Sequence, residues 1–386
     1  MRHFCWNLQC IQRYAVSAVL LLSVLGSARR SQAAQAPPGD SLHVAPRAPF
    51  IFGAYAQGAI IISHTAAVAH LVASHPTGLE LNVQRQTTGA APWHGWYKFP
   101  KVGLALVYYD YHNPILGQSY AASVYLSKPI SRTARHDLSF RLGTGLAYFP
   151  QHYDLYSNRK NTFVSSPLNA TLQLRLEYDV AISQHLGLLM GLGLNHYSNG
   201  ATAKPNFGVN LPTLLLGLNY HQLRPVPTAT ALAPDPADVG HTFWNISTSL
   251  GYKQRTGGDP AHYLVNSVTL AAGRRMNRKS NLLVGLEGFY DRSLMAALRD
   301  TATHPGEHLP DVKKAGGFVG HELLFGRLAL VTHLGFYVYN PYKSNPLFYE
   351  RVGLKYQFTN LLFADIDLKA HLATADVIEF KVGAKL

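Results

Sequence analysis

Two residues that could carry out chemistry together lie almost side by side near the middle of the chain. His196 and Ser198 are separated by a single residue, and Asn210 follows after a short polar stretch. An imidazole beside a hydroxyl can take its proton and make the oxygen a nucleophile, and a third group can hold the imidazole in the required tautomer. Ser198, His196 and Asn210 are therefore candidates for nucleophile, general base and orienting group.

The spacing of apolar residues around this motif predicts where the three side chains point. The even-numbered positions of 186–194 carry large apolar residues, and the same parity continues into His196 and Ser198. Asn210 shares the parity of the apolar positions in 214–220. Because alternate side chains of a strand point to opposite faces, all three are expected on one outer surface. Parity alone does not distinguish a catalytic pair from polar residues where a strand leaves a membrane.

The same alternation recurs along the chain and predicts an all-β protein. In 168–182 the even positions are apolar and the odd positions are polar except Ala181. A strand this long, with one apolar and one polar face, is typical of a transmembrane antiparallel β-barrel of the outer membrane. The odd-numbered Arg175, Glu177 and Asp179, with Arg141, are expected to form an ion network inside the barrel, a channel lining being the alternative. Alternating segments occur at 78–87, 102–112, 118–128, 136–149, 167–182, 185–198, 208–222, 242–254, 261–275, 280–292, 315–326, 328–340, 346–358, 360–374 and 376–386.

The number of these segments predicts one barrel of 12–16 strands. Single-chain bacterial barrels carry even numbers, so 14 is the favoured count. Either one segment is then a false strand, or one further strand lies before residue 78. The segment 54–74 is the place for it, as a first strand or else as a plug helix.

Composition excludes several other classes of protein. Only 14% of the residues are charged, against about 25% in a typical soluble domain, while 47% are hydrophobic. The chain is too apolar for a disordered protein, and no apolar run after residue 25 is long enough for a bundle of membrane-spanning helices. No motif for a metal, a phosphate loop or another cofactor occurs, so none is expected. His64 and His70 lie near no cluster of metal ligands, which favours a rim or loop role for them.

The first residues predict export. Arg2 and Arg13 precede the apolar stretch 14–25, and small residues follow it. Residues 1–36 therefore have the pattern of a signal peptide. The alternative is a retained anchor helix. Cys5 and Cys10 both precede the apolar core, so the exported chain would contain no thiol. Residues 37–77 are predicted to be a linker and an unassigned N-terminal segment, and 78–386 the barrel.

The charge of the chain points to anionic partners. The formal net charge is +13, and removing Arg2, Arg13, Arg29 and Arg30 with the signal peptide leaves +13 − 4 = +9. A basic exported protein favours anionic groups such as the phosphates of lipopolysaccharide, whereas nucleic acid is not an expected partner after export.

The motif at 193–210 resembles the signature of a known family. His196-x-Ser-Asn-Gly, followed by Pro-Asn-x-Gly at 205–208, is similar to the pattern of lipid A 3-O-deacylases of the PagL type, also called acyloxyacyl hydrolases. The stretch 145–148 and Asn158-x-x-Asn161 also resemble the larger members of that group.

This resemblance implies an integral outer-membrane enzyme, a carboxylic ester hydrolase that removes an ester-linked acyl chain from lipid A of lipopolysaccharide. His196 would be the base and Ser198 the nucleophile, in contact with outer-membrane lipids. Asn206 matches a family asparagine associated with the oxyanion pocket, and Asn199 and the backbone at Gly200 are further candidates.

At the position of the family's acidic member, this chain carries Asn210 in place of a glutamate. We therefore expect a slower enzyme or a carboxylate supplied from elsewhere. The alternative function is a non-catalytic outer-membrane pore or structural barrel that retains the motif as a relic. The sequence leaves the oligomeric state open.

Overall fold

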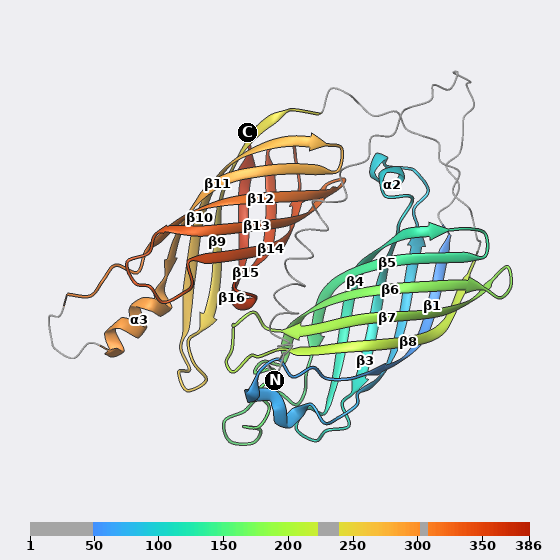
Figure 1. Cartoon of the computed structure of the whole chain (residues 1–386), viewed down its shortest axis with the longest axis horizontal. Coiled ribbons are helices and arrows are strands. Elements are labelled where there is room, and N and C mark those ends of the chain that lie inside the picture. Colours follow the sequence, from blue (N-terminus) through green and yellow to red (C-terminus); the bar gives the residue numbers. More distant parts are fainter. Residues whose placement is uncertain (1–48, 223–238, 302–307) are drawn as a thin grey trace, which may run out of the picture. The chain divides into compact units, whose positions relative to one another are not determined.

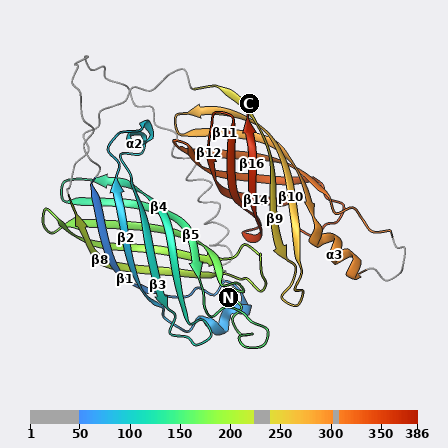
Figure 2. The ribbon, with the colours of Figure 1, turned by 180° about the vertical axis from the view of Figure 1, so that it is seen from behind.

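The structure is a computed structural model, and it describes residues 49–222, 239–301 and 308–386. The predicted signal peptide at 1–36 and the first part of the linker lie outside the described residues. The chain divides into two compact units, to which 49–222 and the described residues from 239 onward belong. Each unit is a closed antiparallel β-barrel, coloured blue to green and yellow to red in Figures 1 and 2.

The first barrel closes by pairing its last strand with its first. Ile51 lies opposite His221 in this closing ladder, and Ala59 lies opposite Thr213. A 3-10 helix, η1 (Ala66–Leu71), follows the first strand, and a short helix, α2 (Pro92–Trp96), follows the second. The eight strands are β1 (Phe50–Ala59), β2 (Thr77–Gln86), β3 (Lys101–Asp110), β4 (Gln118–Arg132), β5 (His136–Tyr148), β6 (Leu168–Ala181), β7 (Leu186–Ser198) and β8 (Val209–His221).

The second barrel has the same architecture. Its last strand returns to its first, with Phe380 opposite Leu250. One helix, α3 (Arg292–Thr301), follows its third strand. The strands are β9 (Thr242–Gln254), β10 (His262–Asn277), β11 (Ser280–Asp291), β12 (Lys314–Phe325), β13 (Leu328–Tyr339), β14 (Phe348–Gln357), β15 (Leu362–His371) and β16 (Thr374–Lys385). Among the residues that the structure describes, no helix is long and apolar enough to cross a membrane.

The all-β class and the barrel architecture are confirmed, but the prediction of one barrel with 14 strands is wrong. The described chain contains 16 strands, in two closed barrels of eight. Each of the predicted alternating segments overlaps one strand, and the additional strand, β1, lies before residue 78. The single-barrel prediction failed because alternation identifies strands but does not show where a sheet closes on itself.

The first barrel turns its apolar side chains outward and its polar side chains into the lumen. In β6, Leu168, Leu172 and Leu176 are exposed, whereas Arg175 and Glu177 on the opposite face are buried. The second barrel shows the same arrangement, with exposed Leu250 and Val268 and buried Arg351. Two apolar outer surfaces, one on each barrel, are therefore present in one chain.

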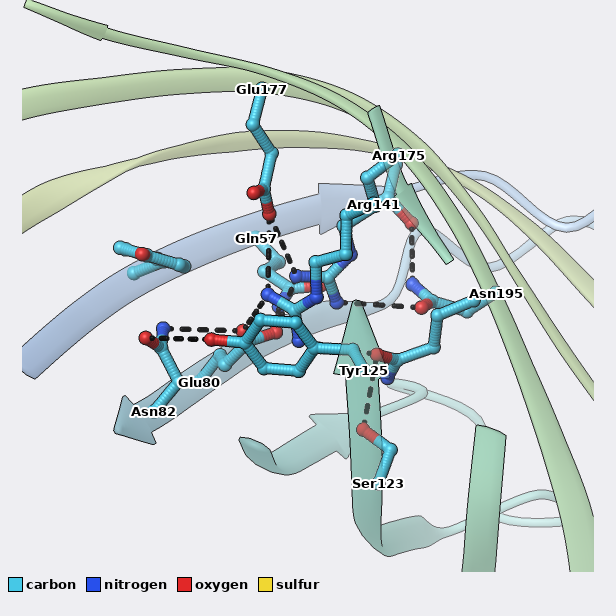
Figure 3. Close-up of polar contacts among 12 residues, drawn as sticks. Gln57, Glu80, Asn82, Ser123, Tyr125, Arg141, Arg175, Glu177 and Asn195 are labelled. Atoms are coloured by element: carbon cyan, nitrogen blue, oxygen red, sulfur yellow. Dashed lines mark hydrogen bonds and ion pairs between the residues drawn. The ribbon is translucent and has the colours of Figure 1, made fainter. Parts of the chain in front are cut away.

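Buried ion pairs fill the lumen of the first barrel (Figure 3). Glu80 lies between two guanidinium groups, with Oε1 2.8 Å from Nη1 of Arg141 and Oε2 2.6 Å from Nη1 of Arg175. Glu177 approaches Arg141 to 3.2 Å, and Arg141 stacks over the ring of Tyr125. These groups form the internal network that the sequence predicts, and they occupy the space that an open channel would need.

Asp179 bonds to two residues of β8. Its carboxylate lies 3.0 Å from Nε2 of His221 and accepts a hydrogen bond from Nδ2 of Asn219. The second barrel has its own network, in which Arg351 pairs with Glu287 and Asp367.

Four hairpin loops meet at one end of the first barrel and cover it. They join β1 to β2, β3 to β4, β5 to β6, and β7 to β8, and η1 lies among them at the end opposite α2 (Figure 1). Val68 and Leu71 of η1 are fully buried in an apolar cluster that includes Tyr109 and Tyr197 from the barrel wall. This packed end holds the loops around the candidate residues.

Candidate active site

His196, Ser198 and Asn210 form one hydrogen-bonded chain. His196 on β7 lies directly opposite Asn210 on β8 in the strand register. Nδ1 of His196 is 2.7 Å from Oδ1 of Asn210, and Nε2 is 3.1 Å from Oγ of Ser198. The structure therefore brings together the three residues that the sequence proposes as nucleophile, base and orienting group.

These side chains lie on the outward row of the barrel wall. Met190 and Leu192 precede them with the same parity and are exposed, whereas Asn195 and Tyr197 on the opposite parity are completely buried. His196 and Ser198 are half-buried beneath the loop that follows β7. The pair is thus reached from the outside of the barrel and not through its lumen.

The loop between β7 and β8 carries hydrogen-bond donors beyond Ser198. Asn206 accepts a hydrogen bond from the backbone N–H of Asn199 through Oδ1, at 3.2 Å. Within the described part of the chain, no hydrogen bond engages Nδ2 of Asn206 or the backbone N–H of Gly200. Gly200 has a φ of +61°, a left-handed conformation in which glycine is favoured.

Asn199 is placed differently from the other candidates. Its side chain is buried and donates through Nδ2 to the hydroxyls of Ser165 and Ser166, at 3.4 and 3.1 Å. Its backbone N–H donates to Oδ1 of Asn206. Asn199 therefore braces the loop after β7 against the loop after β5.

Gly208 allows the loop to approach the imidazole closely. Its φ is +76°, and a Cβ on this residue would lie 2.9 Å from Cε1 of His196 and 3.4 Å from Cβ of Ser198. Its N–H donates to the carbonyl of Phe163, at 2.9 Å. A glycine is thus needed here both for the backbone conformation and for the close approach to His196 and Ser198.

The loop between β5 and β6 supports this contact. Asn161 is fully buried, donates to the carbonyl of Gln151 at 2.7 Å, and accepts from the N–H of Phe163 at 3.2 Å. Asn158 donates to the carbonyls of Ile115 and His152. The Asn158-x-x-Asn161 motif is therefore a loop scaffold that reaches the site through Phe163.

Sequence reasoning missed one neighbour of the site, His64. Nε2 of His64 is 2.8 Å from the carbonyl oxygen of Phe207, and Nδ1 is 3.4 Å from Nδ2 of Asn210. The chain after β1 continues along β8, with the N–H of Ile62 donating to the carbonyl of Asn210 at 3.1 Å. Only knowledge that β1 closes against β8 could have placed His64 here.

The site has no carboxylate partner of the kind expected as compensation for Asn210. The two ring nitrogens of His196 bond to Ser198 and Asn210, and the described residues include no ion pair between this ring and an Asp or Glu. They also include no group of three or more His, Cys, Asp or Glu residues suited to a metal.

Two family models match the chain, one on each barrel. The model for lipid A 3-O-deacylase (PagL) matches residues 77–219, and the model for the C-terminal domain of acyloxyacyl hydrolase matches residues 242–386. The chain belongs to the lipid A 3-O-deacylase (PagL) family. Membership of the PagL family implies a hydrolase that acts on lipid A esters in the outer membrane, and the hydrogen-bonded chain lies within the PagL-matched region.

Other comparisons give little more for this PagL-family chain. No curated protein matches it. Neisserial surface protein A (NspA) is 14% identical, with a TM-score of 0.30, over 45% of this chain and 96% of its own. CdiB from Acinetobacter baumannii is 10% identical, with a TM-score of 0.19, over 87% of this chain and 60% of its own. A mutant porin of Rh. blastica is 11% identical, with a TM-score of 0.18, over 87% of this chain and 100% of its own. Likenesses this low support no inference about the function of this chain.

Proposed function

We propose that this protein is an outer-membrane esterase that removes an ester-linked acyl chain from lipid A, with Ser198 as nucleophile and His196 as base. The observation that carries the proposal is the hydrogen-bonded chain from Ser198 through His196 to Asn210, at 3.1 and 2.7 Å, on the outer wall of the PagL-matched barrel. This arrangement meets the geometric requirement for an activated serine.

In the first step, Oγ of Ser198 attacks the ester carbonyl carbon while its proton passes to Nε2 of His196. The carbonyl oxygen becomes the oxyanion. Asn210 accepts from Nδ1–H of His196 through Oδ1, which keeps Nε2 free to receive the proton. The tetrahedral intermediate then collapses, the alcohol oxygen of the ester leaves, and the imidazolium donates its proton to that oxygen.

Donors for the oxyanion come from the loop after β7. Nδ2 of Asn206 and the N–H of Gly200 follow Ser198 closely, and both are unengaged among the described contacts. Removing one such donor in an acyl-transfer enzyme reduces the rate by about 10²–10³-fold. Asn199 has no part in this step, because its amide and its N–H already hold the loop.

In the second step, water replaces the leaving group. His196 takes a proton from the water, the resulting hydroxide attacks the acyl-serine carbonyl, and Oγ of Ser198 leaves and regains the proton. The products are a free fatty acid and the deacylated lipid. No cofactor or metal is needed to balance either step.

An apolar groove on the same wall suits an acyl chain. Ser198 lies opposite Ala170 on β6, and Ala170 lies opposite Leu146 on β5. From Leu146 and Leu168, a groove of about 800 Å³ continues across the outer face, with Ala122 among its lining residues. A lipid in the outer leaflet would meet this groove and Ser198 from the side.

The alternative of an open pore is disfavoured by the lumen of the first barrel. Arg141, Arg175 and Glu80 are almost completely buried, and both arginines pair with Glu80 across it. A non-catalytic structural barrel remains the competing proposal, and the experiment below separates the two.

The test is mass spectrometry of lipid A from bacteria whose outer membrane contains the wild-type protein or Ser198→Ala. The wild type is expected to remove one acyl mass, and the variant to leave lipid A intact. Ser183→Ala, in the exposed hairpin at the other end of the same barrel, is the matched control and should retain activity. Heat-modifiable gel mobility checks that each barrel is folded. Intact lipid A with a folded wild type, or equal activity of Ser198→Ala, would contradict the proposal.

A further inference from the structure

Asn210 has two chemically different ends, and only one of them serves the proposed reaction. Its Oδ1 can accept a proton from Nδ1 of His196, whereas its Nδ2 can only donate. If the amide were turned around, Nδ2 would donate to Nδ1 and the ring proton would lie on Nε2, facing Ser198. The base would then be unable to accept the serine proton. A carboxylate has no such wrong orientation, so this requirement arises from the asparagine itself.

The contacts of His64 determine which end of the amide faces His196. Nε2 of His64 lies 2.8 Å from the carbonyl oxygen of Phe207, and a carbonyl oxygen only accepts. Nε2 therefore carries the proton, and Nδ1 of the neutral ring is an acceptor. Nδ1 is 3.4 Å from Nδ2 of Asn210, which can donate to it. The reversed amide would bring two acceptors together at this point.

We infer that His64 is a positioning residue whose Nδ1 holds the amide of Asn210 in the orientation that leaves Nε2 of His196 free to accept from Ser198. Every donor and acceptor in the resulting chain is matched, from the Phe207 carbonyl through His64, Asn210 and His196 to the serine hydroxyl. This inference rests on the proposed function, because it assigns His64 a part in activating Ser198.

The experiment measures the reactivity of Ser198 without depending on lipid A. The probe is an alkyl fluorophosphonate, which reacts with an activated serine. The limiting rate of labelling and the binding constant of the probe are measured separately for each purified, folded protein. His64→Phe keeps the ring volume but removes both nitrogens. His64→Asn keeps an acceptor close to the position of Nδ1. His70→Phe is the matched control, because Nε2 of His70 also bonds to a loop carbonyl, that of Lys160, at 2.8 Å.

His64→Phe is expected to lower the limiting labelling rate by roughly 3- to 10-fold, the effect of one neutral hydrogen bond, with the binding constant unchanged. His64→Asn should recover part of the loss, and His70→Phe should have no effect. In an Asn210→Ala background, His64→Phe should cause no additional loss, because no amide is left to orient.

Three results would overturn the inference: an undiminished rate in His64→Phe, an equal loss in His70→Phe, or an additive loss in the Asn210→Ala background. The last would show that His64 only holds the loop at Phe207. Labelling of Ser198 without removal of acyl chains from lipid A would refute the proposed substrate while leaving the effect of His64 measurable. Absence of any labelling of Ser198 in the folded wild type would refute both.

Discussion

Replacing Gly208 by alanine tests whether the loop after β7 sets the position of the base. Gly208 has a φ of +76°, and a Cβ there would lie 2.9 Å from Cε1 of His196 and 3.1 Å from the carbonyl oxygen of Tyr197. The carbonyl of Tyr197 belongs to the strand backbone and cannot move easily, so the imidazole of His196 must move away by a few tenths of an ångström. That movement acts on the 3.1 Å contact between Nε2 and Ser198.

Two effects of different size follow from this geometry. The left-handed backbone makes alanine unfavourable by about 1–2 kcal/mol, which lowers the stability of the barrel. Displacement of a reacting group by about 1 Å costs about 10²-fold in rate, so a smaller shift of the imidazole should lower kcat by about 10-fold. KM should change little, because the apolar groove is not altered.

Gly89→Ala is the control for this prediction. Gly89 has a φ of +98°, but a Cβ there would meet only the ring of Phe99, at 3.4 Å. Both variants should lose similar stability in urea titrations followed by gel mobility, and only Gly208→Ala should lose acyl-chain hydrolysis in a purified assay. Equal kcat in the two variants would show that the contact between Gly208 and His196 does not set the rate.

Two further predictions concern charge. Asn210→Asp should raise the hydrolysis rate at alkaline pH by about 10-fold and move the acidic limb of the pH–rate profile to higher pH. The reason is that a carboxylate near Nδ1 of His196 favours the imidazolium, and an unchanged profile would contradict this. Glu80→Gln should destabilise the first barrel by about 3–5 kcal/mol, because two buried guanidinium groups lose their shared counter-ion. A free energy of unfolding in urea equal to that of the wild type would refute this prediction.

The strands could be predicted from the sequence because the two faces of the wall differ in polarity. β1 was the exception. Its inward face carries Ile51 and Tyr55 while its outward face carries Phe50 and Phe52, so both faces are apolar over its first half and the alternation is hidden. Closure was not predictable either, because the ladder between Ile51 and His221 joins residues that are distant in sequence.

The hydrogen-bonded chain of the candidate site could be predicted because all three of its members lie on β7 or β8. Parity placed His196, Ser198 and Asn210 on one face, and the cross-strand register then brings His196 and Asn210 together. His64 and Asn161 lie in loops whose path no periodicity describes. Their contacts follow from barrel closure and from loop packing, which are visible only in three dimensions.

Closure of the first barrel also has a consequence for how the chain is assembled. Every strand pair of that barrel, including the pair between β1 and β8, is made within residues 50–221. The wall that carries His196, Ser198 and Asn210 therefore closes without any residue of the second barrel. The ladder of β9 to β16 is likewise complete in itself. Substitutions that break strand pairs in one barrel should therefore leave the strand pairs of the other barrel formed.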